Sequence, residues 1–535
     1  MSPTAAALLL TAPAATPLVV AGAYALAGLR TRRPAAVPAP VTAKGPVLVA
    51  EAPAPEEAPE RHPADWAALL SPVVILLCGS LLAAAVVDDG PRTAYSGLLR
   101  ADALTAWMLL VVGAVALIAC GSAPAYLAGE RAAGRAGDAT VTGGSPPGRD
   151  REWWSYHALV QAFLAAMCLA VVTANLGVLW VAVEATTIVT AFLVGHRHTR
   201  TSVEAAWKYV VICSAGIALA FLGTVLIYYA ARQAGIAEAW ALDWPTLVAH
   251  ADRLDPAVTR LGISLIVLGF GAKAGLVPLH AWLPDAHSQA PAPVSALMSG
   301  VLLSVAFAAI LRYRVIADAA LGPDFTRVLL TGIALLTLAL AAGLLLAQRD
   351  YKRMLAYSSM EHMSLIALAA AIGSPLALSA ALLHIAGHGL AKSVAFCASG
   401  RILQITGTAR IGRVRGLLAR APATAGAFGF AVVALMAFPP FSLFASELGI
   451  ARAGFAAGPG LGWATAVALL LVLVAFAALA ARTARMLLGP GTPAEHHPAT
   501  VWPLLVGLAA CAALGVATGP LTDLLDAATQ AIGGH

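Results

Sequence analysis

Ionisable side chains stand singly inside long apolar stretches of this sequence. Glu184 is flanked by Val, Ala and Thr, and Lys273 lies within Gly-Phe-Gly-Ala-Lys-Ala-Gly-Leu-Val-Pro. A charge at the middle of a bilayer costs about 2.5–3.5 kcal/mol on insertion scales, so each such residue needs a reason. An apolar environment favours the neutral form of both side chains, whereas a nearby opposite charge favours the ionised form. Groups balanced in this way can take up and release protons; the alternative is a purely structural, hydrogen-bonded role.

A second set of titratable residues is spaced by four. His384, His388 and Lys392 would form one stripe along a helix, and such a stripe can pass protons through interleaved water. Two histidines at this spacing could also bind zinc, but the acid of an H-E-x-x-H motif is absent, and we expect no metal. Glu447 follows Phe-Pro-Pro-Phe-Ser, which predicts a proline break in another apolar stretch.

Two further candidates lie outside these stretches or at their ends. Lys208 begins an apolar stretch, where it could extend toward the membrane surface or face Glu184, and both interpretations stay open. The segment 278–294 contains His280, Asp285 and His287, which could form a proton uptake point or a hydrogen-bonded lid.

Motifs of cofactor chemistry are missing from the sequence. The six cysteines form no C-x-x-C pair, which argues against iron–sulfur ligands, a zinc site or a disulfide framework. No phosphate-binding loop, dinucleotide fingerprint or nucleophile motif occurs. We therefore expect no cofactor and no nucleic-acid partner, and do not expect this chain to catalyse a redox step itself.

The composition defines the elements that must position these residues. Of the 535 residues, 60% are hydrophobic and 11% are charged, whereas soluble domains average about 25% charged residues. The apolar residues fall in blocks of about 20, the length that crosses a bilayer as a helix. This pattern predicts an all-α polytopic membrane protein of about fourteen transmembrane helices. The expected spans are 4–29, 67–87, 101–127, 156–175, 176–195, 207–231, 259–279, 292–315, 325–347, 353–372, 375–399, 424–450, 462–487 and 500–519.

Proline and basic residues add detail to this arrangement. Pro278 removes a helical hydrogen bond and clashes with the preceding turn, so the seventh span should break just past Lys273. Most Lys and Arg residues outside the spans lie in connections after odd-numbered spans, which the positive-inside rule places in the cytoplasm. We therefore expect a cytoplasmic-membrane protein with both termini outside. The first span lacks a preceding basic residue, and we interpret it as retained rather than as a cleaved signal peptide.

The stretch Lys273–Gly300 resembles a signature of the antiporter-like proton-translocating subunits. It reads KAGLVPLHAWLPDAHSQAPAPVSALMSG. The family occurs in respiratory complex I, in membrane-bound hydrogenases of the formate-hydrogenlyase type and in multisubunit Na⁺/H⁺ antiporters. The residues of this sequence are most similar to the hydrogenase branch. The resemblance implies two inverted five-helix repeats with broken helices 7 and 12. It divides the chain into a first helix (1–30), a disordered cytoplasmic loop (31–65), helices 2–3 with a loop (66–155), the first repeat (156–316), the second repeat (323–488) and a last helix with a tail (500–535).

The resemblance also implies roles for individual residues. Many complex I members carry a lysine early in helix 8, where this sequence has Ser304. A serine hydroxyl can order water or bond its own helix, but it cannot hold a charge, so His280 or water would have to help bridge the repeats. The resemblance implies that Glu184 is the acidic partner, Lys273 the central lysine, Glu447 the exit residue, and that the relay on helix 11 consists of His384, His388 and Lys392. The complete predicted proton relay adds Lys208, His280 and Ser304 to these residues.

The leading functional prediction is a proton-translocating subunit of a redox-driven membrane complex. The expected partners are other membrane subunits, a peripheral redox module and the lipid bilayer, and the transported ion is H⁺ with Na⁺ possible. The alternative is a subunit of a multisubunit Na⁺/H⁺ antiporter without redox coupling. An independent solute transporter is a third hypothesis, which predicts a roomy cavity without a lysine–glutamate pair.

Overall fold

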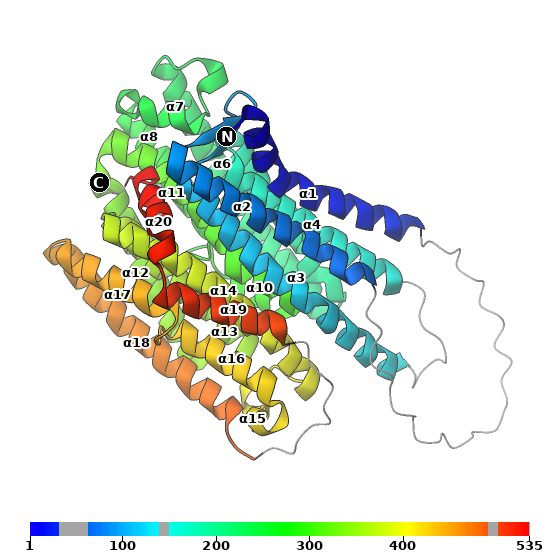
Figure 1. The fold of residues 1–535 in the computed structure, drawn as a ribbon. Helices are drawn as coiled ribbons and strands as arrows, with labels where there is room; N and C mark the ends of the chain where they lie inside the picture. Colours follow the sequence, from blue (N-terminus) through cyan, green and yellow to red (C-terminus); the bar gives the residue numbers. More distant parts are fainter. Residues whose placement is uncertain (31–62, 139–148, 491–500, 534–535) are drawn as a thin grey trace, which may run out of the picture.

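The protein is a bundle of long helices that run side by side (Figure 1). A computed structural model describes residues 1–30, 63–138, 149–490 and 501–533. Twelve helical spans within these ranges are long and apolar enough to cross a membrane, and two further apolar helices, α16 and α19, are shorter. The principal helices are α1 (Pro3–Arg30), α2 (Leu70–Asp89), α3 (Ala103–Asp138), α4 (Arg149–Val172), α5 (Leu176–Val194), α6 (Arg200–Gln233), α8 (Pro256–Lys273), α10 (Ala292–Leu297), α11 (Leu303–Leu321), α12 (Pro323–Ala347), α13 (Tyr351–Ile372), α14 (Pro375–Thr406), α16 (Pro422–Leu435), α17 (Ser442–Ala456), α18 (Pro459–Leu487) and α19 (Trp502–Val516).

Short elements connect the long helices. Strands β1 (Arg92–Ala94) and β2 (Leu99–Ala101) form an antiparallel hairpin in which Arg92 pairs with Ala101. A π-helical turn, η5 (Met298–Leu302), joins α10 to α11. The other short elements are α7 (Trp244–Ala249), α9 (Trp282–Gln289), α15 (Leu417–Arg420), α20 (Thr522–Ala531) and the 3₁₀ turns η1 (Pro63–Leu69), η2 (Gly195–Arg197), η3 (Glu238–Trp240), η4 (Ala251–Arg253), η6 (Ile411–Arg413) and η7 (Gly519–Leu521).

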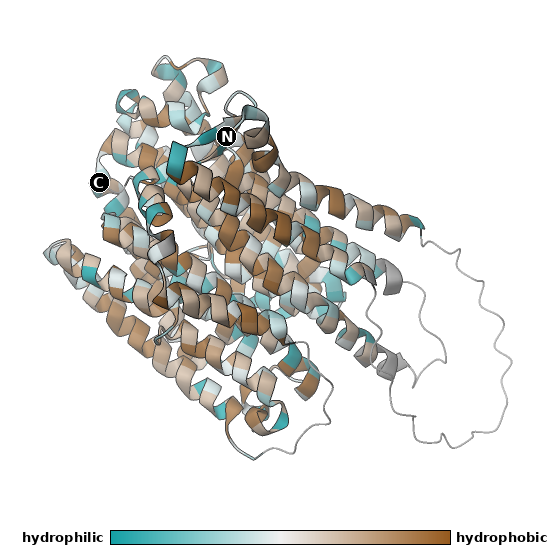
Figure 2. Ribbon diagram, in the orientation of Figure 1, coloured by the Kyte–Doolittle hydropathy of each residue, from teal (hydrophilic) through white to brown (hydrophobic). Residues whose placement is uncertain are grey.

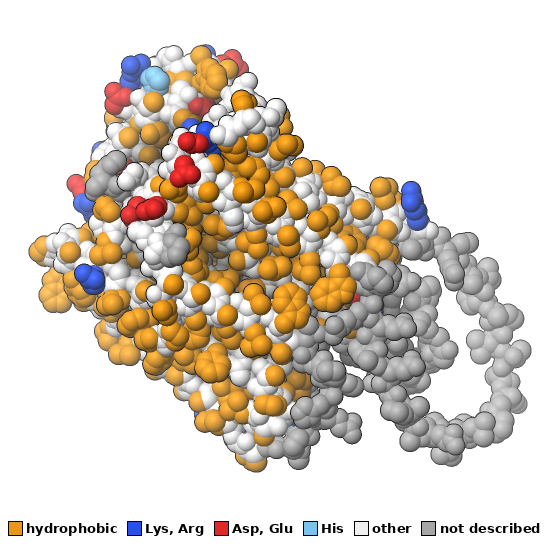
Figure 3. Space-filling view, in the orientation of Figure 1, with side chains coloured by type: hydrophobic (Ala, Val, Ile, Leu, Met, Phe, Trp, Pro, Cys, Tyr) orange, Lys and Arg blue, Asp and Glu red, His pale blue; other side chains and the backbone are white. Residues whose placement is uncertain are grey.

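The flank of the bundle is apolar. Hydrophobic residues cover the long helices (Figure 2), and the space-filling view shows hydrophobic side chains across the flank, while acidic and basic residues gather near the end that carries α7 (Figure 3). Large side chains such as Leu8, Val328 and Leu470 are exposed on this surface. A patch of this extent is unusual on a protein surrounded by water and matches contact with lipid. The all-α polytopic membrane fold predicted from composition is thus confirmed.

Polar side chains define where several helices begin. The side chain of Asn175 accepts hydrogen bonds from two backbone amides at the start of α5, and Asp255 does the same at the start of α8. Asp350 and Ser374 cap α13 and α14. These caps satisfy amides that have no partner within the helix, so they fix the helix starts at the ends of the apolar blocks.

Helix α14 lies at the centre of the bundle. The apolar windows of α14 and of the α10–α11 span are completely buried inside the protein. The indole Nε1 of Trp107 on α3 donates a 3.0 Å hydrogen bond to the Leu382 carbonyl of α14. Gly300 and Gly389 let η5 and α14 approach closely, because a Cβ at Gly300 would lie 2.9 Å from the Gly389 carbonyl oxygen. The polar stripe of α14 therefore faces protein rather than lipid.

The two predicted helix breaks are confirmed. Helix α8 ends at Lys273, and a non-helical segment leads to α9, with Gly275 at φ 77° in the region that favours glycine. Helix α16 ends at Leu435, and α17 begins at Ser442 after the two prolines. Irregular backbone at membrane depth is tolerated where protein or a polar cavity surrounds it, and the two breaks lie beside the ionisable residues Lys273 and Glu447.

The extents of two expected loops differ from the structure. Residues 130–152 are rich in Gly, Arg and Pro, which predicts a surface loop over this whole range, but α3 continues to Asp138 and α4 begins at Arg149. The loop expected over 31–65 ends earlier, since η1 begins at Pro63, and residues 31–62 lie outside the described ranges. Both chain ends lie at the α7 end of the bundle (Figure 1), as an even number of crossings requires. The count of fourteen spans, the domain boundaries and the inverted repeats stay predictions.

Candidate functional site

Lys273 lies at the centre of a polar cluster formed by α5, α6 and α8. Its side chain is completely buried. The Nζ atom donates hydrogen bonds to Thr187 Oγ1 at 2.8 Å and to Tyr209 Oη at 2.6 Å, and it lies 4.8 Å from the centre of the Tyr209 ring. Both partners are neutral hydroxyls. The ammonium group is therefore held by dipoles, without a directly bonded counter-ion among the described residues.

Glu184 is joined to this lysine through a single hydroxyl. Thr187 Oγ1 donates a 3.0 Å hydrogen bond to Glu184 Oε2 while it accepts from Lys273. The Ser214 hydroxyl donates a second hydrogen bond, of 3.1 Å, to Glu184 Oε1. The half-buried carboxylate and the buried lysine thus share a continuous polar path. The predicted connection between Glu184 and Lys273 is confirmed, with Thr187 as a link that sequence reasoning missed.

Glycines bring the helices of this cluster together. A Cβ at Gly269 would lie 2.5 Å from both the Ala220 amide nitrogen and the Gly216 carbonyl oxygen. Helices α6 and α8 can cross this closely only because side chains are absent, a common device at helix contacts in membranes. The crossing is one turn before Lys273, so it sets the distance between the lysine and Tyr209 on α6.

Lys208 lies at the surface rather than in the buried cluster. Its Nζ atom forms ion pairs with Glu204 at 2.7 Å and with Asp285 at 3.1 Å. Asp285 also pairs with Arg353 of α13. Of the two open interpretations, the one in which Lys208 faces Glu184 is therefore wrong, and the surface position is correct, because exposed Glu204 and half-buried Asp285 pair with its ammonium group. Asp285 instead links α6, α9 and α13 at this surface.

The two histidines after the α8 break have different surroundings. His280 is half-buried, and its Nδ1 donates a 3.2 Å hydrogen bond to the Pro278 carbonyl. His287 is completely buried beside the rings of Trp282 and Phe396. Neither ring nitrogen of His287 has a hydrogen-bond partner in the part of the chain that the structure describes. The Lys273 cluster and His287 are thus separated by hydrophobic ring contacts.

Ser304 is completely buried in the first turn of α11. Its hydroxyl forms no hydrogen bond to any described residue, so the bond to its own helix, one of the two expected alternatives, is not formed. The π-helical turn η5 precedes it, and π-turns occur frequently at functional sites. The neighbouring Ser299 hydroxyl is hydrogen-bonded to Ser359 of α13 at 2.7 Å.

The stripe on α14 is assembled as predicted. His384, His388 and Lys392 are all completely buried. Lys392 Nζ donates hydrogen bonds to the Leu355 carbonyl at 2.7 Å and to the Ser358 hydroxyl. These acceptors are neutral, as they are at Lys273. Lys273 and Lys392 are therefore both buried and hydrogen-bonded to neutral oxygens.

His362 of α13 joins this stripe, although the sequence analysis did not select it. Its Nδ1 atom lies 3.1 Å from His384 Nε2, and its ring centre lies 5.2 Å from the rings of both His384 and His388. Glu447 of α17 is half-buried, and one of its carboxylate oxygens lies within 4.8 Å of one ring nitrogen each of His362 and His384. His362 is a titratable residue inside an apolar span, but only its contact with His384 on another helix links it to the stripe.

Lys352 is a second buried residue that sequence reasoning missed. Its Nζ atom donates hydrogen bonds to the carbonyls of Ser288 at 2.8 Å and Ala290 at 2.9 Å. These carbonyls lie at the C-terminal end of α9, where a cation is favourable. The sequence places Lys352 beside Arg349 and Arg353, which is typical of a surface loop and conceals its burial.

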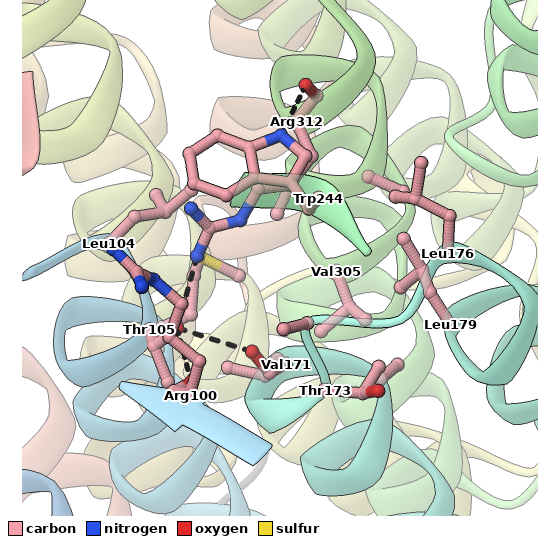
Figure 4. Close-up of a pocket in the computed structure, with 15 residues that line it drawn as sticks. Arg100, Leu104, Thr105, Val171, Thr173, Leu176, Leu179, Trp244, Val305 and Arg312 are labelled. Atoms are coloured by element: carbon pink, nitrogen blue, oxygen red, sulfur yellow. Dashed lines mark hydrogen bonds between the residues drawn. The ribbon is translucent and has the colours of Figure 1, made fainter. Parts of the chain in front are cut away.

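A polar hollow lies at the α7 end of the bundle (Figure 4). The labelled Arg100, Thr105 and Arg312 gather on one side of it, and Leu176 and Leu179 lie on the other. The hollow offers about 20 Å³ to the centre of a water molecule, which is enough for one ordered water.

An ion pair closes one side of this hollow. Arg312 donates hydrogen bonds to both carboxylate oxygens of Asp102, and its guanidinium lies 4.5 Å from the Trp244 ring. Burial raises the pKa of the Asp102 carboxyl, but the Arg312 guanidinium outweighs this and holds the pKa at about 2. Asp102 therefore remains ionised at neutral pH and acts here as a fixed structural partner.

Comparison with known proteins places the chain in a family. Residues 173–473 match the family described as NADH:quinone oxidoreductase/Mrp antiporter, TM. The chain is 41% identical over 318 residues to a hydrogenase-4 component F homolog of Methylacidiphilum infernorum, covering 59% of this chain and 67% of the relative. It is 33% identical over 316 residues to NADH-quinone oxidoreductase subunit N of Desulforudis audaxviator, covering 58% of this chain and 61% of the relative.

Solved structures share the fold over nearly the whole chain. A chain of the archaeal membrane-bound sulfane sulfur reductase superposes with a TM-score of 0.79 at 24% identity, covering 99% of this chain and 98% of that one. A chain of the Mrp complex from Dietzia sp. DQ12-45-1b gives 0.78 at 20% identity, covering 98% and 97%. The protein therefore belongs to the NADH:quinone oxidoreductase/Mrp antiporter transmembrane family, as its Lys273–Gly300 signature predicted.

Proposed function

We propose that this chain is a proton-translocating subunit of a redox-driven membrane complex. The observation that carries the proposal is the fully buried Lys273, which among the described residues is hydrogen-bonded only to the hydroxyls of Thr187 and Tyr209 and is joined to Glu184 through Thr187. A lysine held by neutral oxygens pays a desolvation cost when charged, and a carboxylate one hydroxyl away offsets part of it. Small changes around the pair can therefore load or unload its proton.

The second half of the proposed relay follows α14. Lys392 is held by neutral oxygens, as Lys273 is, and the stripe continues through His388 and His384 toward half-buried Glu447. Buried imidazoles can accept and donate protons through their two nitrogens. In this proposal Glu447 is the point at which protons leave, since its carboxylate reaches the hollow between α13, α17 and α18.

Ser304 would connect the two halves. Its free, buried hydroxyl can donate one hydrogen bond and accept two. It lies about one turn beyond Gly300, where η5 touches α14 at Gly389, next to His388. A water held by this hydroxyl would relay a proton between the halves without holding charge. Lys208 lies outside the buried path, and His280 stays a proposed bridge near Lys273.

The names of two similar proteins support the proposal that this chain belongs to a redox complex. The similar hydrogenase-4 component F homolog and NADH-quinone oxidoreductase subunit N are named as parts of redox complexes. We therefore expect neighbouring membrane subunits and a peripheral redox module. The excess of basic residues in connections after odd-numbered spans supports an orientation with the α7 end and both termini outside the cytoplasmic membrane.

Purification of the tagged chain from its native membrane, followed by identification of its neighbours, tests the assembly. The purified complex in vesicles should then acidify one side when an electron donor is supplied, in the absence of Na⁺. Na⁺-dependent proton exchange that persists without any redox subunit would instead establish the antiporter alternative. Purification of the chain alone, with no proton flux under either condition, would contradict both.

A further inference from the structure

Three metal-ligating side chains from three helices converge in the second half of the bundle. They are His362 of α13, His384 of α14 and Glu447 of α17, and one ligand atom of each lies within 4.8 Å of the others. Both histidines are completely buried. None of the proton-transfer roles proposed above requires His362, so those roles do not explain why the three side chains converge.

The spacing of the two imidazoles matches that of neighbouring ligands on one metal ion. His362 Nδ1 and His384 Nε2 are 3.1 Å apart. Zinc binds histidine nitrogen at about 2.0–2.1 Å in tetrahedral geometry, which places two ligand atoms roughly 3.4 Å apart. The two nitrogens therefore need to move by only a few tenths of an ångström to share an ion.

The hydrogen bonds around His384 orient its ring for this task. Its Nδ1 lies 2.9 Å from Ser446 Oγ, and that hydroxyl donates to the Leu443 carbonyl. Nδ1 must then donate to Ser446, which leaves the lone pair of Nε2 directed at His362. A metal-bound histidine usually donates its other ring nitrogen in this way.

The surroundings supply a further histidine, and a small hollow borders Glu447. His388 is completely buried, its ring centre is 5.2 Å from that of His362, and neither of its nitrogens has a partner among the described residues. Glu447 lines the hollow between α13, α17 and α18, together with Ile450 and Thr465.

We propose that His362, His384 and Glu447 form a binding site for a divalent transition metal ion with zinc-like ligand preference, and that the bound ion blocks proton transfer through α14. Two imidazoles and one carboxylate suit Zn²⁺ rather than Mg²⁺ or Ca²⁺, which prefer oxygen ligands only. The ion occupies the lone pairs that His384 and Glu447 would use for protons. The blocking effect rests on the proposed function, whereas the binding does not.

The test measures Zn²⁺ binding and proton pumping separately on the intact purified complex. Equilibrium dialysis against Zn²⁺ is compared for the wild type, His362→Gln, Glu447→Gln and the control Glu361→Gln, which changes a neighbouring buried carboxyl outside the ligand set. We expect His362→Gln and Glu447→Gln each to weaken one Zn²⁺ site about tenfold or more, and Glu361→Gln to leave it unchanged. In wild-type vesicles, Zn²⁺ should inhibit redox-driven pumping over the concentration range in which this site fills.

The outcomes separate the site from the proposed function. Equal Zn²⁺ binding by all four proteins overturns the site, as does equal weakening by the Glu361→Gln control. If both ligand variants lose Zn²⁺ binding but Zn²⁺ does not inhibit pumping by the wild type, the metal site is supported. The proposed proton route along α14 is then overturned. If one ligand variant fails to assemble, the other decides the binding result, because the two ligands come from different helices.

Discussion

Replacing Thr187 by valine removes the hydroxyl that joins Lys273 to Glu184 and keeps the size of the side chain. Thr187 accepts a 2.8 Å hydrogen bond from Lys273 and donates one of 3.0 Å to Glu184. A hydrogen bond to a charged group contributes about 1.5–3 kcal/mol. Tyr209 and Ser214 retain one bond to each partner, so we take the loss of one such bond as the net effect. At about 1.4 kcal/mol per tenfold in rate, proton transfer should slow by about tenfold to a hundredfold.

The assay is redox-driven acidification of vesicles that contain the assembled complex, with electron transfer recorded in parallel. Thr186→Val is the matched control, because the adjacent buried Thr186 hydroxyl donates only to the Val183 carbonyl of its own helix. Both variants make the same chemical change at neighbouring positions of α5. Equal pumping by the two variants, at equal assembly, would refute the role of Thr187 as a link.

Three further predictions concern other parts of the bundle. Ser304→Ala should slow pumping by removing the hydroxyl that holds the bridging water, while Ser304→Lys should be tolerated; an unchanged rate in the alanine variant removes Ser304 from the path. Gly269→Ala should lower the midpoint of thermal unfolding in detergent, because its Cβ would lie 2.5 Å from the Ala220 nitrogen and overpacking costs about 1–3 kcal/mol. Gly271→Ala, whose Cβ would meet only ordinary contacts at 3.7 Å, should not lower it, and equal midpoints would show that α6 and α8 can separate freely. Lys392→Met should reduce pumping at least tenfold with assembly intact, since methionine fills the space but carries no proton; normal pumping would place the route elsewhere.

The sequence predicted the membrane class and the helix breaks because both depend on local patterns. Apolar blocks of span length define the helices, and Pro278 and the Pro439–Pro440 pair act on the turns directly before them. Lys273, His384, His388 and Lys392 were predictable because a titratable residue in an apolar block is conspicuous. Loop extents were less accurate, since the charged ends of α3 and α4 extend beyond their apolar parts.

The links between helices could not be read from the sequence. Thr187 and Tyr209 are ordinary residues of apolar helices until Lys273 of α8 lies against them. His362 is recognised as part of the site only through its contact with His384, which lies 22 residues away on another helix. The two interpretations of Lys208 stayed open because its position along α6 does not reveal Asp285, which comes from the segment after the break. These contacts depend on helix rotation and crossing, which single-chain periodicity does not determine.

The most direct test of the account is proton translocation by the Lys273→Ala variant, normalised to electron transfer by the same complex. Lys273 is completely buried on α8, and alanine suits a helix, so assembly should persist. The account predicts that the variant complex assembles and that its redox-driven acidification falls to the background of uncoupled vesicles. Acidification at the wild-type ratio of protons to electrons would contradict the account, because protons would then cross without the lysine on which the proposed path depends.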